Sequence, residues 1–176
     1  VSATFVIIIV VLGALLEKTG ASGVLMDVAV SMTRKSRGGP AKAAVVGSSL
    51  MGMISGTAVA NVLTTGTISI PLMKRAGYKP SVAGAVEAVA STGGQLMPPI
   101  MGAAAFLMAD IMEVPYLEIT KSALLPAILF YIAVFWAVHL EALKAGLRPL
   151  GNFEVPDVID SLRNNGHVLL AIPVFV

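Results

Sequence analysis

Cysteine is absent from the chain, and histidine occurs only at His139 and His167, far apart in the sequence. The missing cysteines exclude disulfide bonds, thiolate metal sites and cysteine nucleophiles. Charge is also scarce, because 12% of the residues are charged, whereas soluble domains carry about 25%. The formal net charge of +2 gives no basic surface for nucleic acid. We therefore expect neither a metalloenzyme nor a nucleic-acid-binding protein.

Apolar residues dominate what is present. Hydrophobic residues make up 56% of the chain and the mean hydropathy is +0.87, which is typical of a protein that lies in a lipid bilayer. The chain opens inside the apolar run VSATFVIIIVVLGALL and closes soon after another apolar run begins. We therefore expect an internal fragment of a larger membrane protein.

Segment lengths and flanking charges predict the order of the membrane segments. A spanning helix needs about 20 apolar residues. Residues 1–16 fit the end of one span, residues 21–33 are short and amphipathic enough for an interfacial helix, and residues 122–138 fit a further span. We expect residues 139–166 to form a basic cytoplasmic loop and residues 167–176 to begin the next span.

An uncharged block at residues 43–73 lies between two basic loops, RKSRGGPAK and KRAGYK. Basic loops beside membrane segments usually face the cytoplasm. A re-entrant helical hairpin keeps both loops on that side, whereas one long tilted span rich in small residues would put them on opposite sides. The matching flanks favour the hairpin, with its tip at residues 55–58.

Residues 81–109 predict a transmembrane helix that is broken near its middle. The stretch STGGQLMPP, at residues 91–99, contains two glycines that add flexibility and two prolines that remove amide donors. Unwound backbone at membrane depth is tolerated only where it is buried in protein or lines a wet cavity. The break therefore indicates a binding site, and its free carbonyls could hold a sodium ion while helix N-termini face an anionic substrate.

Polar side chains near the break have competing interpretations. Glu87 could neutralise an ion or relay a proton, but we favour a pairing with a lysine or a helix end near the cytoplasmic surface. Asn61, Thr64 and Thr65 follow the hairpin tip at helical spacing and are expected to line the site; their alternative role is hydrogen bonding between helices.

Residues 38–116 resemble the large membrane subunit of the tripartite ATP-independent periplasmic (TRAP) transporters. The resemblance rests on SGTAVANVLTTGTISIPLMKRAGY and EAVASTGGQLMPPIMGAAAF, and it is strongest for the subgroup with fused small and large membrane subunits and a TAXI-type binding protein. It implies an all-α integral membrane protein, one half of an inverted-repeat, elevator-type transporter. It also implies sodium-coupled import of organic acids across a bacterial or archaeal cytoplasmic (inner) membrane, which the protein crosses several times.

The resemblance also implies which residues form the site. A sodium ion would be held, mostly through backbone oxygens, by Ser55, Ala58, Gly94, Met97 and Pro99. The neighbours that would line the ion or substrate site are Thr57, Asn61, Thr92 and Gln95. No cofactor other than the coupling ion is expected.

Two other functional classes compete with this interpretation. One is another ion-coupled transporter, or a channel-like membrane subunit, that works without a binding protein. The other is a membrane enzyme, which is disfavoured because no base stands beside Ser55 or Ser91 to activate a nucleophile. Sodium dependence of uptake would separate the transporter from a passive channel.

Overall fold

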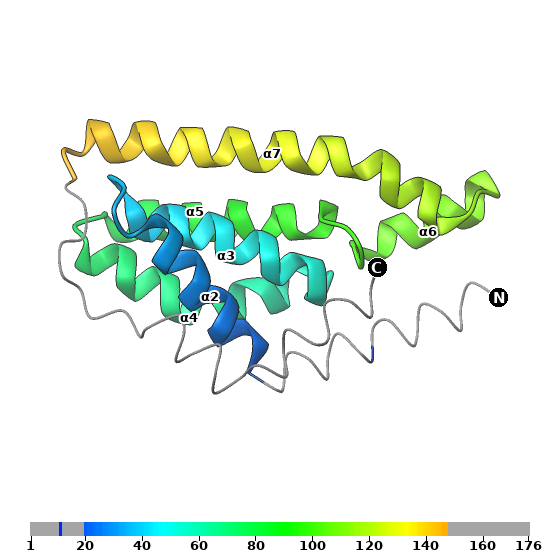
Figure 1. Cartoon of the computed structure of the whole chain (residues 1–176), viewed down its shortest axis with the longest axis horizontal. Coiled ribbons are helices and arrows are strands. Elements are labelled where there is room, and N and C mark those ends of the chain that lie inside the picture. The colour runs from blue at the N-terminus through cyan, green and yellow to red at the C-terminus, as the bar shows by residue number, and fades with distance from the viewer. Residues whose placement is uncertain (1–10, 12–19, 148–176) are drawn as a thin grey trace.

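The structure, a computed structural model, describes Val11 and residues 20–147. Every regular element within residues 20–147 is helical, which confirms the expected all-α class (Figure 1). The predicted spans at residues 1–16, apart from Val11, and at residues 167–176 lie outside the described residues, as does most of the predicted loop at residues 139–166.

Six α-helices and one short 3₁₀ helix follow one another along the described residues. They are α2 (Ala21–Thr33), α3 (Gly39–Ser55), α4 (Ala58–Arg75), α5 (Pro80–Gly93), η1 (Gly94–Leu96), α6 (Ala103–Met112) and α7 (Tyr116–Lys144). Pro40 and Pro80 lie in the first turns of α3 and α5, where a missing amide hydrogen leaves no helical bond unmade. Thr57 caps α4, because its hydroxyl oxygen accepts a hydrogen bond from the amide of Ala60 at 3.3 Å.

Helix α7 is longer than the predicted span at residues 122–138. It extends from Tyr116 to Lys144, so the first residues of the predicted loop at residues 139–166 are helical. Charged residues at helix ends do not terminate a helix: Glu118 in the first turn and Lys144 in the last turn both interact favourably with the helix dipole. Among the described residues, α7 is the one helix long and apolar enough to cross a membrane.

Helices α3, α4 and α5 pack against one another, and α2 packs on α3. Helix α7 runs alongside α3 and α5, and its first turns pack against α6 (Figure 1). Many of the buried side chains at these contacts are small, which lets the helix backbones approach closely. The main core cluster consists of Ala41, Ala44, Val45, Met73, Tyr78, Ala83, Ala90, Tyr131, Val138 and Ala142. A second cluster joins the segment after η1 to α6 and α7, and consists of Met101, Ala105, Ala109 and Ile119.

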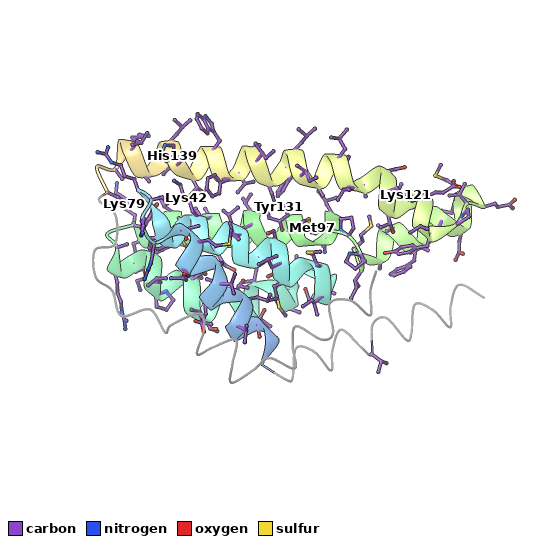
Figure 2. The ribbon with its side chains drawn as sticks, viewed as in Figure 1. Lys42, Lys79, Met97, Lys121, Tyr131 and His139 are labelled. Atoms are coloured by element: carbon purple, nitrogen blue, oxygen red, sulfur yellow. The ribbon has the colours of Figure 1, made fainter. Side chains whose placement is uncertain are left out.

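The two basic loops lie at the same end of the described chain. Figure 2 shows Lys42 and Lys79 beside His139 at that end, Met97 near the middle and Lys121 at the opposite end. This arrangement follows from the two-residue connection at residues 56–57, which turns α4 back along α3. The helices extend somewhat beyond the predicted hairpin at residues 43–73. How this hairpin sits in a bilayer stays a prediction.

Polar contacts fix the two loops against the end of α7. The Tyr78 hydroxyl donates to the carbonyl oxygen of Gly38 at 3.5 Å, and Lys42 Nζ lies 5.1 Å from the centre of the Phe135 ring. Burial, and secondarily the nearby Glu141 carboxylate, raises the pKa of Tyr78 to about 12, so this hydroxyl remains a donor at physiological pH. These contacts join the loop after α4 to the start of α3, and the start of α3 to α7.

Candidate ion and substrate site

The hairpin meets the end of α5 through two glycines. A Cβ atom on Gly52 of α3 would lie 2.3 Å from the Cα atom of Gly94, and one on Gly94 would lie 2.9 Å from the Cα atom of Gly52. Both distances are far shorter than the 3.5–4.0 Å of a favourable carbon contact. Glycine at both positions is therefore what allows the two backbones to touch.

Asn61 joins the two limbs of the hairpin beside this contact. Its side chain is fully buried, and its Nδ2 donates to the carbonyl oxygen of Ser48 at 2.9 Å. The same nitrogen would lie 2.6 Å from a Cβ atom on Gly94. Asn61 was predicted to line the site or to bond between helices, and the structure shows the second of these contacts at the position where α3, α4 and α5 converge.

The tip of the hairpin contacts the chain that follows η1. Gly56 has a φ of 61°, and a Cβ atom there would lie 2.3 Å from the carbonyl oxygen of Met101. A residue with a side chain would be strained by this φ and would also collide with Met101. Because α4 begins at Ala58 and α6 begins at Ala103, this contact brings two helix N-termini into the same region.

The backbone between η1 and α6 has few helical hydrogen bonds. Pro98 and Pro99 lack amide hydrogens, so the carbonyls of Gly94 and Gln95 cannot bond to the residues four positions later. These carbonyls accept instead from the amides of Met97 at 3.1 Å and Gly102 at 2.8 Å. Each carbonyl oxygen has two lone pairs, so each can accept one more interaction than these amides provide.

Helix α7 supports this irregular segment from outside. The Tyr116 hydroxyl lies 2.9 Å from the carbonyl oxygen of Pro99 and 2.7 Å from that of Ile100, and its ring stacks on Phe106 of α6 with 4.6 Å between centroids. One hydroxyl hydrogen is thus shared between two carbonyls that have no helical donor. Tyr116 lies between the predicted helices at residues 81–109 and 122–138, and no sequence pattern predicted this contact.

The predicted site residues lie on two sides of the contact between hairpin and break. Ser55 and Ala58 flank the tip and are half-buried, Gly94 is buried, and Met97 and Pro99 are half-buried after it. Thr57, Thr92 and Gln95 are exposed, and the Thr92 hydroxyl donates to its own helix, at Ala88, over 2.7 Å. Coordination of an ion by these residues stays a prediction.

Glu87 is buried with hydroxyl partners, and the favoured pairing with a lysine or a helix end is wrong. Its side chain is 1% exposed. Oε1 accepts from Thr65, from Ser91 at 3.1 Å and from Ser48 at 3.5 Å, and Oε2 accepts from Ser69. Thr65, one of the residues predicted to line the site, thus bonds across helices instead.

Segment lengths and charges did not predict this cluster, but the spacing of polar residues in the sequence does carry a signal for it. Thr65 and Ser69 are four residues apart on α4, as are Glu87 and Ser91 on α5, so each pair lies on one helical face. Two polar pairs on apolar helices in membrane-like sequence indicate a shared buried network. Ser48, which comes from α3, had no such local partner.

Among residues 20–147 every regular element is helical, and interrupted helices that meet through backbone are a feature of secondary transporters. The comparison with protein families agrees, because the model for the DctM component of the tripartite ATP-independent periplasmic transporters matches residues 1–176. The chain belongs to this family of membrane transporter components, which confirms the resemblance to the large TRAP subunit.

Relatives among curated proteins are consistent with this family. The chain is 32% identical over 120 residues to the uncharacterized protein y4mL of Sinorhizobium fredii, covering 66% of the chain and 28% of the relative. It is 29% identical over 130 residues to the C4-dicarboxylate TRAP transporter large permease protein DctM of Pseudomonas aeruginosa, covering 74% and 30%. It is 29% identical over 90 residues to the uncharacterized protein YgiK of Salmonella typhimurium, covering 51% and 21%. The chain therefore spans less than a third of each of these relatives.

Proposed function

We propose that the chain forms part of the permease of a sodium-coupled secondary transporter that imports organic acids. The permease would cross the cytoplasmic (inner) membrane of a bacterium or archaeon several times. Membership of the DctM family supports transport, and the name of the Pseudomonas aeruginosa relative supports a carboxylate substrate. Sodium coupling is inferred from the kind of ligand that the broken helix offers.

The observation that carries the proposal is the contact between the hairpin and the break. Gly52 and Gly94 bring the two backbones together, and the carbonyls of residues 94–99 lie next to this contact without a full set of helical bonds. Carbonyl oxygens are hard ligands and suit an alkali cation. Sodium bound by Ser55, Ala58, Gly94, Met97 and Pro99 would hold the hairpin on the break.

The same contact offers a place for a carboxylate. The N-termini of α4 and α6 are brought together by Gly56 and Met101, and each N-terminus carries a partial positive charge and free amide hydrogens. A bound sodium ion would add to this positive potential. Substrate and ion would then bind cooperatively, which is what coupled import requires.

The full transporter would have further parts. We propose that an extracytoplasmic solute-binding protein of the TAXI type delivers the substrate, and that a small membrane subunit is fused to the large one in the full-length chain. The words "tripartite" and "periplasmic" in the family description support such partners. The alternative is another ion-coupled or channel-like membrane subunit that works without a binding protein.

Uptake by the full-length permease in liposomes tests the proposal. Radiolabelled C4-dicarboxylate, added with the binding protein, should accumulate when sodium is outside and should not accumulate when choline replaces sodium. Gly94→Leu should abolish accumulation, whereas Gly84→Leu on the preceding helix α5 should not, because a Cβ atom on Gly84 meets no atom within 4 Å. Accumulation without sodium, or without the binding protein, would contradict the coupling or the partnership respectively.

A further inference from the structure

A narrow groove with a volume of about 310 Å³ runs between α3 and α7. Val45 of α3 and Tyr131 of α7 are buried at its floor, whereas Ile132 and Trp136 are exposed at its rim. The groove is therefore open along the outer side of α7, which is the described helix long and apolar enough to cross a membrane.

The lining of the groove suits an apolar occupant. Its two side-chain hydroxyls belong to Ser49 and Tyr131, and they already donate to the carbonyl oxygens of Val46 at 2.7 Å and Ala90 at 3.0 Å. The other lining side chains are apolar. An organic acid or a sugar would lose its hydrogen bonds to water in the groove and gain almost none in return.

The dimensions of the groove fit a hydrocarbon chain better than a helix. From Ile128 to Trp136, α7 rises about 12 Å, so a volume of about 310 Å³ corresponds to a mean cross-section of about 26 Å². A helix with its side chains is about 10–12 Å across, which requires a cross-section of about 80 Å² or more. A methylene chain is about 4–5 Å across, because carbon atoms pack about 3.5–4.0 Å apart.

The groove covers the depth of one leaflet. Figure 2 shows Lys42 and His139 at the end that carries the basic loops, with Tyr131 and Met97 nearer the middle. Both Tyr131 and Met97 line the groove. Its length of about 12 Å is close to the hydrocarbon thickness of one leaflet, about 15 Å. An acyl chain that enters from the basic end would thus reach the irregular backbone at Met97.

Two residues with unused hydrogen-bonding capacity lie where the groove reaches the basic end. Lys42 Nζ lies 5.1 Å from the centre of the Phe135 ring, which lines the groove, and this ammonium group has no hydrogen bond or ion pair within the described residues. The His139 ring lies 5.8 Å from that of Trp136, and its Nδ1 is buried without a hydrogen-bond partner. Both groups could donate to an anion placed at this end of the groove.

The charges around these two residues also favour an anion. The Glu141 carboxylate lies near Tyr78 at this end. It is outnumbered by exposed basic side chains of the two loops and of the last turn of α7, namely Arg34, Arg37, Lys35, Lys74, Arg75, Lys79 and Lys144. Each basic residue near a membrane surface strengthens the binding of anionic lipid about fivefold.

We propose that the α3–α7 groove binds an anionic phospholipid, with one acyl chain in the groove and the phosphate group at Lys42 and His139. The lipid comes from the leaflet at the basic end, which the positive charge predicts to be the cytoplasmic one. Because its acyl chain contacts Met97, it supports the segment between η1 and α6 from the side of α7. This site requires only that the protein lies in a membrane, so it is independent of sodium coupling and of the substrate.

Quenching of Trp136 fluorescence by phosphatidylglycerol brominated on its acyl chains tests the proposal. The Trp136 signal is the difference between the purified full-length permease in detergent and its Trp136→Phe variant. Quenching should saturate, and phosphatidylcholine with the same brominated chains should require at least fivefold higher concentrations. Absence of quenching by either lipid would mean that protein covers the groove, and would overturn the proposal.

Matched variants separate this site from lipid that merely surrounds the protein. Lys42→Gln should weaken phosphatidylglycerol binding about fivefold, whereas Lys74→Gln, at an exposed position of the same end, should not. Ser49→Phe fills the groove and should remove saturable quenching, whereas Leu129→Phe, exposed on α7 outside the groove, should retain it.

Two results from these variants would overturn the site. One is equal quenching by the two lipids that Lys42→Gln leaves unchanged, and the other is equal quenching in Ser49→Phe and Leu129→Phe. If Ser49→Phe does not fold, the comparison of the two lipids with the wild type and Lys42→Gln still decides. Transport is not measured in any of these experiments, so their failure would leave the proposed function untouched.

Discussion

Gly52→Ala should separate the hairpin from the break. The added Cβ atom would lie 2.3 Å from the Cα atom of Gly94, so the backbones must part by about 1.2 Å to reach an ordinary carbon contact. No rotamer change relieves this overlap, because the opposing atom belongs to the main chain. Overpacking of this kind costs about 1–3 kcal/mol, against a gain of about 0.5–1 kcal/mol from replacing glycine within a helix.

Taking the midpoints of these two ranges, the expected net loss is about 1.25 kcal/mol, which lowers the equilibrium constant for docking about eightfold. Gly84→Ala is the matched control, since Gly84 is also helical and has no atom within 4 Å of an added Cβ. This control should show only the gain from replacing glycine within a helix, and its free energy of unfolding should rise by about 0.5–1 kcal/mol.

Two measurements on the full-length permease would check this reasoning. Thermal denaturation followed by circular dichroism should show a lower midpoint for Gly52→Ala and an unchanged or higher one for Gly84→Ala. Sodium-dependent uptake in liposomes should fall for the first variant alone. A Gly52→Ala protein as stable and as active as the control would refute the glycine contact as the basis of docking.

Three further predictions concern other parts of the site. Asn61→Ala should lower the free energy of unfolding by about 1–3 kcal/mol, because the Ser48 carbonyl loses a buried donor; a denaturation midpoint equal to the wild type would count against this. Tyr116→Phe keeps the stacked ring but removes a hydrogen bond worth about 0.5–1.5 kcal/mol, so amide exchange over residues 97–102 should accelerate, and unaltered exchange would contradict the bracing role. Single cysteines at the exposed positions of Lys35 and Lys74 should be labelled from one side of the membrane and a cysteine at Lys121 from the other; opposite labelling of the first two would exclude the re-entrant hairpin.

Local sequence signals predicted the elements better than their contacts. The amphipathic stretch at residues 21–33 coincides with α2, because glycine precedes it and charged residues follow it. Helix α7 extends beyond the predicted apolar span at both ends, since charges at helix ends stabilise a helix as readily as they interrupt an apolar run. Pro98 and Pro99 correctly predicted an interruption between α5 and α6. This prediction succeeds because a proline affects the hydrogen bonds of only a few neighbouring residues.

Contacts between distant residues could not be inferred in the same way. Nothing near Gly52 in the sequence identifies Gly94 as its neighbour, and Ser48 has no local signal that connects it to Glu87. The error on Glu87 has a physical origin: carboxylates are usually buried with a cation, and hydroxyls contributed by three separate helices are visible only when these helices are packed.

The glycine contact between α3 and the end of α5 also has a mechanical consequence. If side chains interdigitated across this contact, separating the two helices would require rotamer changes and would leave cavities. Gly52 and Gly94 contact each other through main-chain atoms, so the two segments can separate without rearranging side chains at this point. A seam of this kind can open without unpacking the helices on either side.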